Sequence, residues 1–145
     1  MKSRRVDVRD VETILAIQSA CPEIAQWTAR DYERVARGEM AGWVSEDVAS
    51  IAGFIVVRRI VNEIEILNFA VSPTERGRGI GSALLDESLA WGREFGAVLA
   101  MLEVRASNTT ALRFYERHNF QLVGRRAGYY KEPVEDALLL SAKLN

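Results

Sequence analysis

A glycine-rich segment at residues 77–81, Gly-Arg-Gly-Ile-Gly, constrains the fold of this chain more than any other sequence feature. It follows an apolar stretch at residues 63–71 with the composition of a strand, and it precedes a helical pattern that closes at Gly96. An almost unbroken apolar run at residues 98–104 comes next. Such a run between turn signals is typical of a strand buried on both faces. A strand, a helix and a further buried strand predict a sheet with at least one crossover connection.

The rest of the chain adds short helices and strands around this unit. Before it, hydrophobic periodicity and turn residues predict a first strand at residues 6–9, helices at 10–22 and 28–38, and strands at 42–46 and 50–60. After it, the same signals predict a helix at 108–118 and strands at 120–126 and 136–144. We therefore expect one domain over residues 1–145, of the α/β or α+β class, with a mixed central sheet flanked by helices.

Several polar residues have the positions of helix caps. Thr28 and Asp31 have the spacing of an acidic capping box, and Asp10 and Asn108 are suitable N-cap residues for the helices that follow them. Asn119 follows the last predicted helix, where it can adopt the left-handed conformation that glycine usually takes. These residues predict where three of the helices begin and where the last one ends.

Composition and charge exclude several classes of function. The chain has 145 residues, with 19 basic and 20 acidic side chains and a formal charge of −1. We expect no direct nucleic-acid partner and no membrane partner, because no overall field attracts the protein to a polyanion. The single cysteine, Cys21, and the single histidine, His118, predict no disulfide, no metal site and no catalytic thiol. The basic N-terminal residues precede no long apolar segment, so we expect a cytoplasmic protein without a signal peptide or membrane span.

A glycine-rich segment between a strand and a helix can bind a phosphate group. Converging backbone N–H groups and the partial positive charge of a helix N-terminus favour an anion there, and Arg76 and Arg78 add positive charge. The segment has no Walker-loop lysine, which disfavours ATP hydrolysis. Residues 77–82 nearly match a dinucleotide-binding fingerprint, with Glu103 in place of the ribose acid. On these residues alone, an ordinary strand-to-helix turn is a further alternative.

Two motifs make the chain similar to the GNAT superfamily of N-acetyltransferases. Arg76-x-x-Gly79-x-Gly81 has the Arg/Gln-x-x-Gly-x-Gly/Ala signature of that superfamily's coenzyme A loop. Residues 102–108 and 111–120 resemble a stretch typical of bacterial ribosomal-protein-alanine and related N-terminal acetyltransferases. The similarity extends over about residues 63–140. It implies the GNAT acyl-CoA N-acyltransferase fold, with acetyl-CoA as cosubstrate and no metal.

The resemblance also implies which residues bind coenzyme A. Backbone amides of the glycine-rich loop would bind its pyrophosphate. Backbone groups at the end of the preceding strand would pair with the pantetheine arm and polarise the thioester. The implied cofactor-binding residues are Phe69, Ala70, Val71, Arg76, Gly77, Arg78, Gly79, Ile80, Gly81, Ser82 and Asn108.

Glu103 and Tyr115 are the candidate catalytic residues. Acyl transfer to an amine requires a neutral nucleophile, and a protein α-amine with a pKa of about 8 is already partly neutral at pH 7. Glu103 interrupts an apolar run where a charge is costly, and it is the candidate base, directly or through a water. Its alternative is a structural carboxylate that pairs with Arg105 or caps a backbone group. Tyr115 lies two helical turns after Asn108 and is the candidate acid for the leaving thiolate, with packing on an amphipathic helix as its alternative.

The acceptor side is less constrained by sequence. Tyr129 and Tyr130 are candidates for the acceptor groove, because a tyrosine combines contact area with a polar tip, and core or edge packing is their alternative. The chain departs from the family pattern at Gln26, before Trp27, and by an extra residue after Arg126. The resemblance favours a protein N-terminus as acceptor, above all the N-terminal alanine of a small-subunit ribosomal protein. Another amine and a non-catalytic acyl-CoA-binding module are alternatives, and the oligomeric state is left open.

Overall fold

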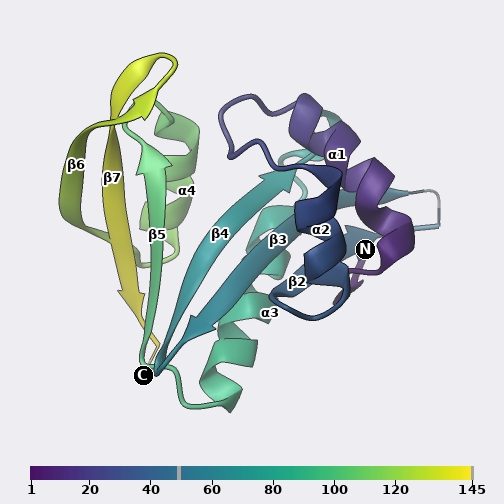
Figure 1. Ribbon diagram of the computed structural model, residues 1–145. Coiled ribbons are helices and arrows are strands. Elements are labelled where there is room, and N and C mark those ends of the chain that lie inside the picture. The colour runs from purple at the N-terminus through teal and green to yellow at the C-terminus, as the bar shows by residue number, and fades with distance from the viewer. Residues whose placement is uncertain (49, 145) are drawn as a thin grey trace.

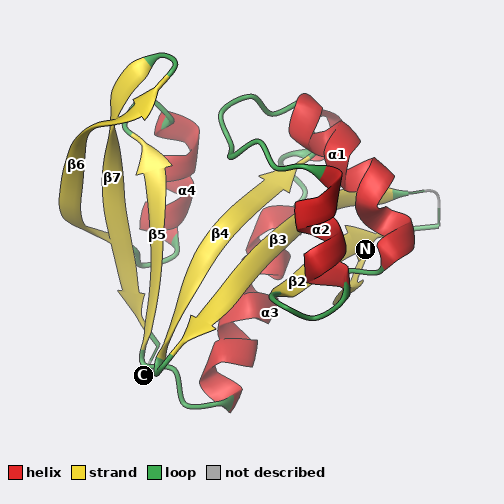
Figure 2. Cartoon of the chain, viewed as in Figure 1, coloured by secondary structure: helices red, strands yellow, loops and turns green. Residues whose placement is uncertain are grey.

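The computed structural model describes residues 1–48 and 50–144 as one seven-stranded mixed sheet with helices on both faces (Figures 1 and 2). The predicted domain also includes residues 49 and 145, which lie outside the described residues. The elements in chain order are β1 (Lys2–Arg5), the short 3₁₀ helix η1 (Val8–Asp10), α1 (Val11–Ser19), α2 (Ala29–Ala36), β2 (Ala41–Glu46), β3 (Ile51–Ile60), β4 (Glu63–Val71), the 3₁₀ helix η2 (Pro73–Glu75), α3 (Ile80–Glu94), β5 (Leu99–Arg105), α4 (Thr109–Arg117), β6 (Gln121–Lys131) and β7 (Val134–Lys143).

The strands lie in the order β1-β2-β3-β4-β5-β7-β6. The neighbouring strands β1 and β2, β2 and β3, and β3 and β4 pair in antiparallel fashion. The strands β4 and β5 are parallel, because the chain crosses over through α3 between them. The helices α1 and α2 cover one face of the sheet, and α3 and α4 cover the other (Figure 2). The predicted mixed sheet and its crossover are therefore confirmed.

The strands β4 and β5 separate soon after they begin to pair. Their register joins only Glu63 to Leu99, Ile64 to Ala100 and Glu65 to Met101 among the described residues. In Figure 1 the two strands then diverge, so the carboxyl half of β4 has no neighbouring strand on that side. The register between β3 and β4 also shifts at Leu67. Val56 pairs with Asn68 and Val57 with Ile66, so Leu67 is an extra residue of β4 in a β-bulge. The split and the bulge together leave the edge of β4 near residues 68–71 accessible from the β5 side.

The predicted first strand is wrong. The strand is Lys2–Arg5, and the alternation at residues 6–9 belongs to a turn and to η1. Two local hydrogen bonds explain the difference: the Asp7 carboxylate accepts from the Arg9 amide at 3.1 Å, and the Asp10 carboxylate accepts from the Asp7 amide at 2.7 Å. This capping box closes η1, and Val8 points into solvent. Asp10 stands at the N-cap of α1 as predicted but makes no side-chain capping bond to it.

Other helix ends follow the sequence more closely. Thr28 and Asp31 form the predicted capping box of α2, and the Asn108 side chain accepts from the Ala111 amide at 3.2 Å at the start of α4. Gly96 and Asn119 have φ values of 90° and 69°, in the left-handed region that ends a helix. The predictions for these caps are confirmed.

The prediction that residues 98–104 are buried on both faces is wrong. In β5 the side chains of Ala100, Leu102 and Val104 are buried, whereas the alternating ones are half-exposed. The apolar run concealed an ordinary alternation, because Leu99 and Met101 on the second face are apolar without being fully covered. The two closing strands also extend further than predicted, since β6 and β7 stay paired to Lys131 and Val134.

A buried carboxylate fixes the start of the chain to the sheet. Arg4 binds both oxygens of Asp10 at 2.8 Å and also pairs with Glu46 at 2.8 Å. Burial would raise the pKa of Asp10, but the bonds from Arg4 and from the Asp7 amide outweigh it and hold that pKa below its usual value. A carboxylate with a lowered pKa stabilises the fold above its usual pKa of about 4, and that stability is lost as the pH falls through the lowered value.

We therefore expect Asp10→Asn to reduce the free energy of unfolding by about 1–3 kcal/mol at pH 7, because the partly buried guanidinium of Arg4 loses one of its two charged partners. The loss should shrink at low pH, where the wild type loses the same interaction. Urea denaturation at neutral and acidic pH measures both values. Asp86→Asn, at an exposed position of α3, is the matched control and should change neither. Equal effects of the two variants would contradict this account of Asp10.

Candidate active site

A cleft of about 570 Å³ lies between the end of β4, the glycine-rich loop and the helices α3 and α4. Eleven of the thirteen predicted site residues line it: Phe69, Ala70, Val71, Arg76, Gly77, Gly79, Ile80, Gly81, Ser82, Asn108 and Tyr115. Arg78 and Glu103 do not. Residues that are separate in sequence thus meet in one cavity because the split between β4 and β5 opens beside the N-terminus of α3.

The glycine-rich loop presents backbone amides to this cleft. Gly77 and Gly79 have φ values of 81° and 80°, which an L side chain rarely adopts. Gly79 is the N-cap of α3 and has no side chain to cap it, so the first intrahelical bond runs from the Ala83 amide to the Gly79 carbonyl at 3.0 Å. The preceding amides, at residues 80–82, have no acceptor within the helix. Three adjacent N–H groups at a helix N-terminus form a site for an anion such as a phosphate.

The two arginines of the loop have other partners in this structure. Arg76 donates to the Val71 carbonyl at 3.1 Å and also contacts Glu23 and the Cys21 sulfur, each at 3.3 Å. Arg78 pairs with Glu75 at 3.1 Å. Both guanidinium groups of the loop therefore already have protein partners in this structure.

Tyr115 lies on α4 with its ring buried and its side chain in the lining of the cleft. The ring packs against Phe69, Phe114 and Phe120, with centroid distances of 6.3, 5.4 and 5.3 Å. Burial raises the pKa of Tyr115 above its usual range. Within the described part of the chain, no group hydrogen-bonds its hydroxyl. Tyr115 therefore lines the cavity as a phenol that keeps its proton at neutral pH.

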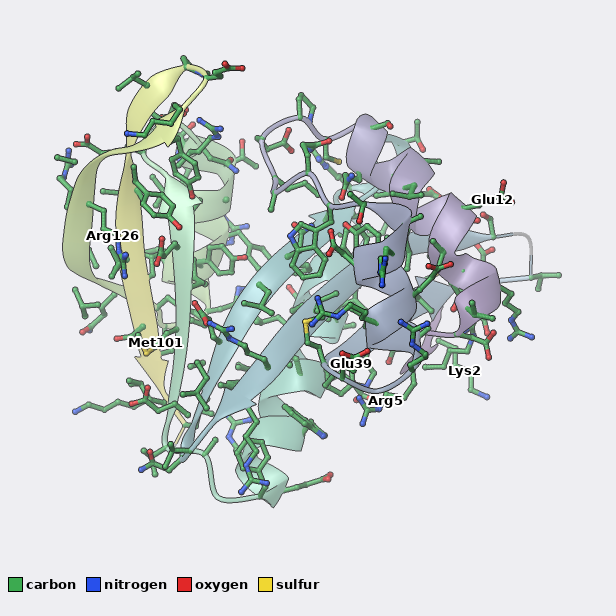
Figure 3. The ribbon with its side chains drawn as sticks, viewed as in Figure 1. Lys2, Arg5, Glu12, Glu39, Met101 and Arg126 are labelled. Carbon is green, nitrogen blue, oxygen red and sulfur yellow. The ribbon has the colours of Figure 1, made fainter. Side chains whose placement is uncertain are left out.

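Glu103 lies on β5, on the face opposite the buried Leu102 and Val104, and about a quarter of its side chain is exposed, at 23%. Its partner is Arg126, at 3.4 Å, which projects from the edge strand β6 (Figure 3). The alternative pairing with Arg105 is wrong, because Arg105 binds Glu135 at 3.0 Å. Glu103 thus lies beside Arg126 and does not line the cleft that holds Tyr115.

The two candidate acceptor tyrosines pack against arginine side chains. Tyr130 packs under Arg105, whose guanidinium carbon is 4.1 Å from the ring centroid, and Tyr129 packs against Arg126 at 5.6 Å. Tyr129 is 48% exposed, so it is not a core residue. Both tyrosines lie on β6, near the β6–β7 turn, at the same end of the molecule as the loop between α1 and α2 (Figure 1).

Sequence reasoning missed several residues of the cleft. Thr109 and Thr110 form the first turn of α4 after Asn108, a position that its N-cap pattern could have indicated. Phe114 precedes Tyr115 and also lines the cavity. Glu23 and Ile24 come from the loop between α1 and α2, where no periodicity marks them.

Cys21 and His118 have structural partners. Cys21 is buried, and burial raises the pKa of its thiol, which does not favour a nucleophile. His118 ends α4, where its ring nitrogens contact the Phe114 carbonyl at 2.8 Å and the Ser82 hydroxyl at 3.0 Å. His118 therefore ties the end of α4 to the start of α3.

Within residues 1–48 and 50–144, no group of three or more His, Cys, Asp or Glu side chains is arranged to hold a metal ion. No helix in these ranges is long and apolar enough to cross a membrane.

The sequence matches a known family over most of its length. The model of the acetyltransferase (GNAT) family matches residues 10–120. A Bacillus subtilis (strain 168) protein, provisionally named [ribosomal protein bS18]-alanine N-acetyltransferase, is 28% identical over 98% of this chain and 95% of its own length. The [ribosomal protein bS18]-alanine N-acetyltransferase of Escherichia coli (strain K12) is 31% identical over 66% of each chain.

Solved structures share the fold. The ribosomal-protein-S18-alanine N-acetyltransferase from Escherichia coli has a TM-score of 0.86 and 22% identity, over 99% of this chain and 94% of that one. Arabidopsis thaliana NAA60 in complex with acetyl-CoA has a TM-score of 0.85 and 22% identity, over 98% and 97% of the two chains. At this level of identity the likeness establishes the architecture of the sheet and helices.

Proposed function

The chain belongs to the acetyltransferase (GNAT) family, and we propose that it transfers the acetyl group of acetyl-CoA to the N-terminal α-amine of a protein. The proposed acceptor is the N-terminal alanine of a small-subunit ribosomal protein, in keeping with the names of the relatives from Bacillus subtilis and Escherichia coli. We also propose a cytoplasmic location, where such an acceptor is made.

The observation that carries this proposal is one cavity that is lined both by the glycine-rich loop with the first residues of α3 and by Tyr115. The amides of residues 80–82 have the geometry to bind the pyrophosphate of coenzyme A. The open edge of β4 at Phe69 to Val71 offers backbone partners for the pantetheine arm, and Asn108 offers its side chain. Tyr115 lines the same cavity, and we propose that its hydroxyl donates a hydrogen bond to the leaving sulfur.

The reaction proceeds by direct attack in this proposal. The neutral α-amine attacks the thioester carbonyl, the new C–N bond forms and the C–S bond breaks. Glu103 receives the proton of the amine through a water, because its carboxylate lies outside the cleft. Tyr115 donates to the thiolate, and its raised pKa makes stabilisation by a hydrogen bond at least as important as full proton transfer.

Radiolabelled acetyl-CoA with a panel of peptides tests the proposed acceptor. We expect label on a peptide with N-terminal alanine and none on a blocked peptide with an internal lysine. Transfer to small amines but to no α-amine of a peptide would contradict the proposed acceptor while leaving the family unaffected.

A pair of glycine variants tests the proposed anion site. Gly79→Ala places a side chain at a φ of 80°, at a cost of roughly 1–2 kcal/mol, and should distort the amides of the cleft. We expect the Kd for acetyl-CoA to rise by about tenfold, which corresponds to about 1.4 kcal/mol. Gly96→Ala is the matched control, because Gly96 has a φ of 90°, equally open surroundings and no place in the cleft.

Calorimetry with acetyl-CoA measures both variants, and urea denaturation measures their stability. Both should lose similar stability, and only Gly79→Ala should lose affinity. An equal change in Kd for the two variants would show that the loop acts through general stability and would contradict the proposed anion site.

A further inference from the structure

A buried polar network connects α1, α2 and β4. Gln18, Tyr32 and Asn68 come from these three elements and are 6%, 0% and 5% exposed. The Tyr32 hydroxyl donates to the Gln18 side-chain oxygen, and the Asn68 side-chain nitrogen donates to the Tyr32 oxygen at 3.0 Å. Buried polar groups are costly unless each has a partner, so three such residues in contact form a unit that specifies one arrangement.

The network holds the backbone of the loop between α1 and α2. The Gln18 amide donates to the Trp27 carbonyl and accepts from the Trp27 N–H, both at 2.9 Å. Asn68 donates to the Ala25 carbonyl at 3.0 Å. Three hydrogen bonds therefore fix residues 25–27, and the Trp27 ring packs on Tyr32 at 5.4 Å. Loops commonly run over the surface, whereas the backbone of this loop is anchored to buried side chains.

The other end of the network reaches the reacting edge of β4. The Asn68 side-chain oxygen accepts from the Phe69 N–H at 3.1 Å, at the bulge where β4 leaves its regular register with β3. Phe69 lines the cleft and packs against Tyr115. One amide side chain thus joins the backbone at Ala25 to the backbone at Phe69.

The loop itself borders the cleft. Glu23 and Ile24 line it, and Glu23 also pairs with Arg76 of the glycine-rich loop at 3.3 Å. The hydrogen bonds of the network stabilise the fold, and they also end on the backbone of residues 25–27, directly after the residues of the loop that line the cleft. The placement of its bonds therefore points to control of the position of this loop relative to β4.

We propose that Asn68, supported by Tyr32 and Gln18, is a positioning residue that sets the loop at residues 20–28 against the edge of β4. The loop would then hold the first residues of an extended peptide so that its free α-amine points at the thioester carbonyl. This proposal rests on the proposed acetyl transfer to a protein N-terminus. Misplacement of an acceptor by about 1 Å is enough to reduce the rate on the order of a hundredfold.

Two variants and a control test this role. Tyr32→Phe removes one hydroxyl from the network. Asn68→Leu keeps a similar side-chain volume but removes the hydrogen bonds of Asn68 to the Ala25 carbonyl and to the Phe69 N–H. Ser88→Ala is the control, because Ser88 is 0% exposed and its hydroxyl donates to the Leu85 carbonyl at 2.8 Å in α3, away from the cleft. The measurements are kcat and KM for a peptide with N-terminal alanine, the Kd for acetyl-CoA, and amide hydrogen exchange at Trp27 and Phe69.

We expect all three variants to lose stability, and only the network variants to change acceptor kinetics. In Asn68→Leu the KM for the peptide should rise on the order of tenfold or more, while the Kd for acetyl-CoA stays near its wild-type value. Exchange at Trp27 and Phe69 should accelerate. Tyr32→Phe should show the same changes in smaller size, which keeps the test informative if Asn68→Leu does not fold.

The positioning role would be overturned if Tyr32→Phe, and Asn68→Leu where it folds, kept the wild-type KM for the peptide and the wild-type amide exchange at Trp27 and Phe69. An equal rise in KM with Ser88→Ala would overturn it too, because the effect would then follow stability. Failure of the wild type to acetylate any peptide is a separate result that would overturn the proposed function.

Discussion

Tyr115→Phe should lower kcat by about 10²–10³-fold and leave the Kd for acetyl-CoA nearly unchanged. The ring is fixed by Phe69, Phe114 and Phe120, and a phenylalanine keeps those contacts. Only the hydroxyl is lost, and in the proposed mechanism it is the donor to the leaving sulfur. Single-turnover transfer to a peptide with N-terminal alanine, together with calorimetry of acetyl-CoA, measures the two quantities separately.

The stability of this variant is an internal control. No described residue hydrogen-bonds the Tyr115 hydroxyl, so its removal leaves no buried partner unsatisfied, and the free energy of unfolding should change by less than about 0.5 kcal/mol. Tyr32→Phe removes a hydroxyl with two buried partners and should be clearly less stable. A Tyr115→Phe enzyme with full kcat would show that Tyr115 is a packing residue only.

The pH dependence of wild-type kcat adds to this test. Because burial raises the pKa of Tyr115, the phenol stays protonated above neutral pH. Loss of its proton should therefore cause no decline of kcat below about pH 10, the usual pKa of tyrosine. A decline that vanishes in Tyr115→Phe and has a midpoint near pH 8 would contradict the assignment.

Glu103→Gln should lower kcat/KM at pH 7 by about 10²-fold, or about 2.7 kcal/mol of transition-state stabilisation. The amide keeps the size of the side chain and removes the base. The residual rate should climb as the pH rises through the α-amine pKa of about 8, because the substrate then loses its proton without help. The rate profile from pH 6 to 9 measures this recovery.

The matched control is Glu65→Gln, which removes a similar carboxylate on β4 from its ion pair with Arg58 at 2.6 Å. It should leave kcat/KM unchanged, since Glu65 does not line the cleft. Equal losses of kcat/KM in Glu65→Gln and Glu103→Gln would mean that removal of a carboxylate from the sheet disturbs the structure, and that Glu103 does not act as a base.

The sequence was sufficient to predict the architecture where local signals and the long-range arrangement agree. The capping box at Thr28, the left-handed residues Gly96 and Asn119, and the crossover from β4 to β5 each depend on short stretches of chain. The same is true of the glycine-rich loop at residues 77–81. The GNAT fold that the motifs implied is confirmed by the family match and by the solved structures.

The failures have a common physical cause. Val6 and Val8 alternate like a strand, but a bond from Asp10 to the Asp7 amide closes a turn there. The contact of Glu103 with Arg126 depends on the pairing of β5 with β7 and of β7 with β6, which a single sequence does not reveal. Asn68 likewise appears in the sequence as one polar residue in a strand, and its role becomes visible only when the loop near Ala25 folds over it.

The central claim is that the backbone amides at the start of α3 bind the pyrophosphate of coenzyme A and so place the thioester beside Tyr115. A crystal structure of the protein with coenzyme A tests it most directly. We expect pyrophosphate oxygens within hydrogen-bond distance of the amides of residues 80–82, and the sulfur within reach of the Tyr115 hydroxyl. A pyrophosphate bound elsewhere, with these amides turned away from it, would contradict the claim.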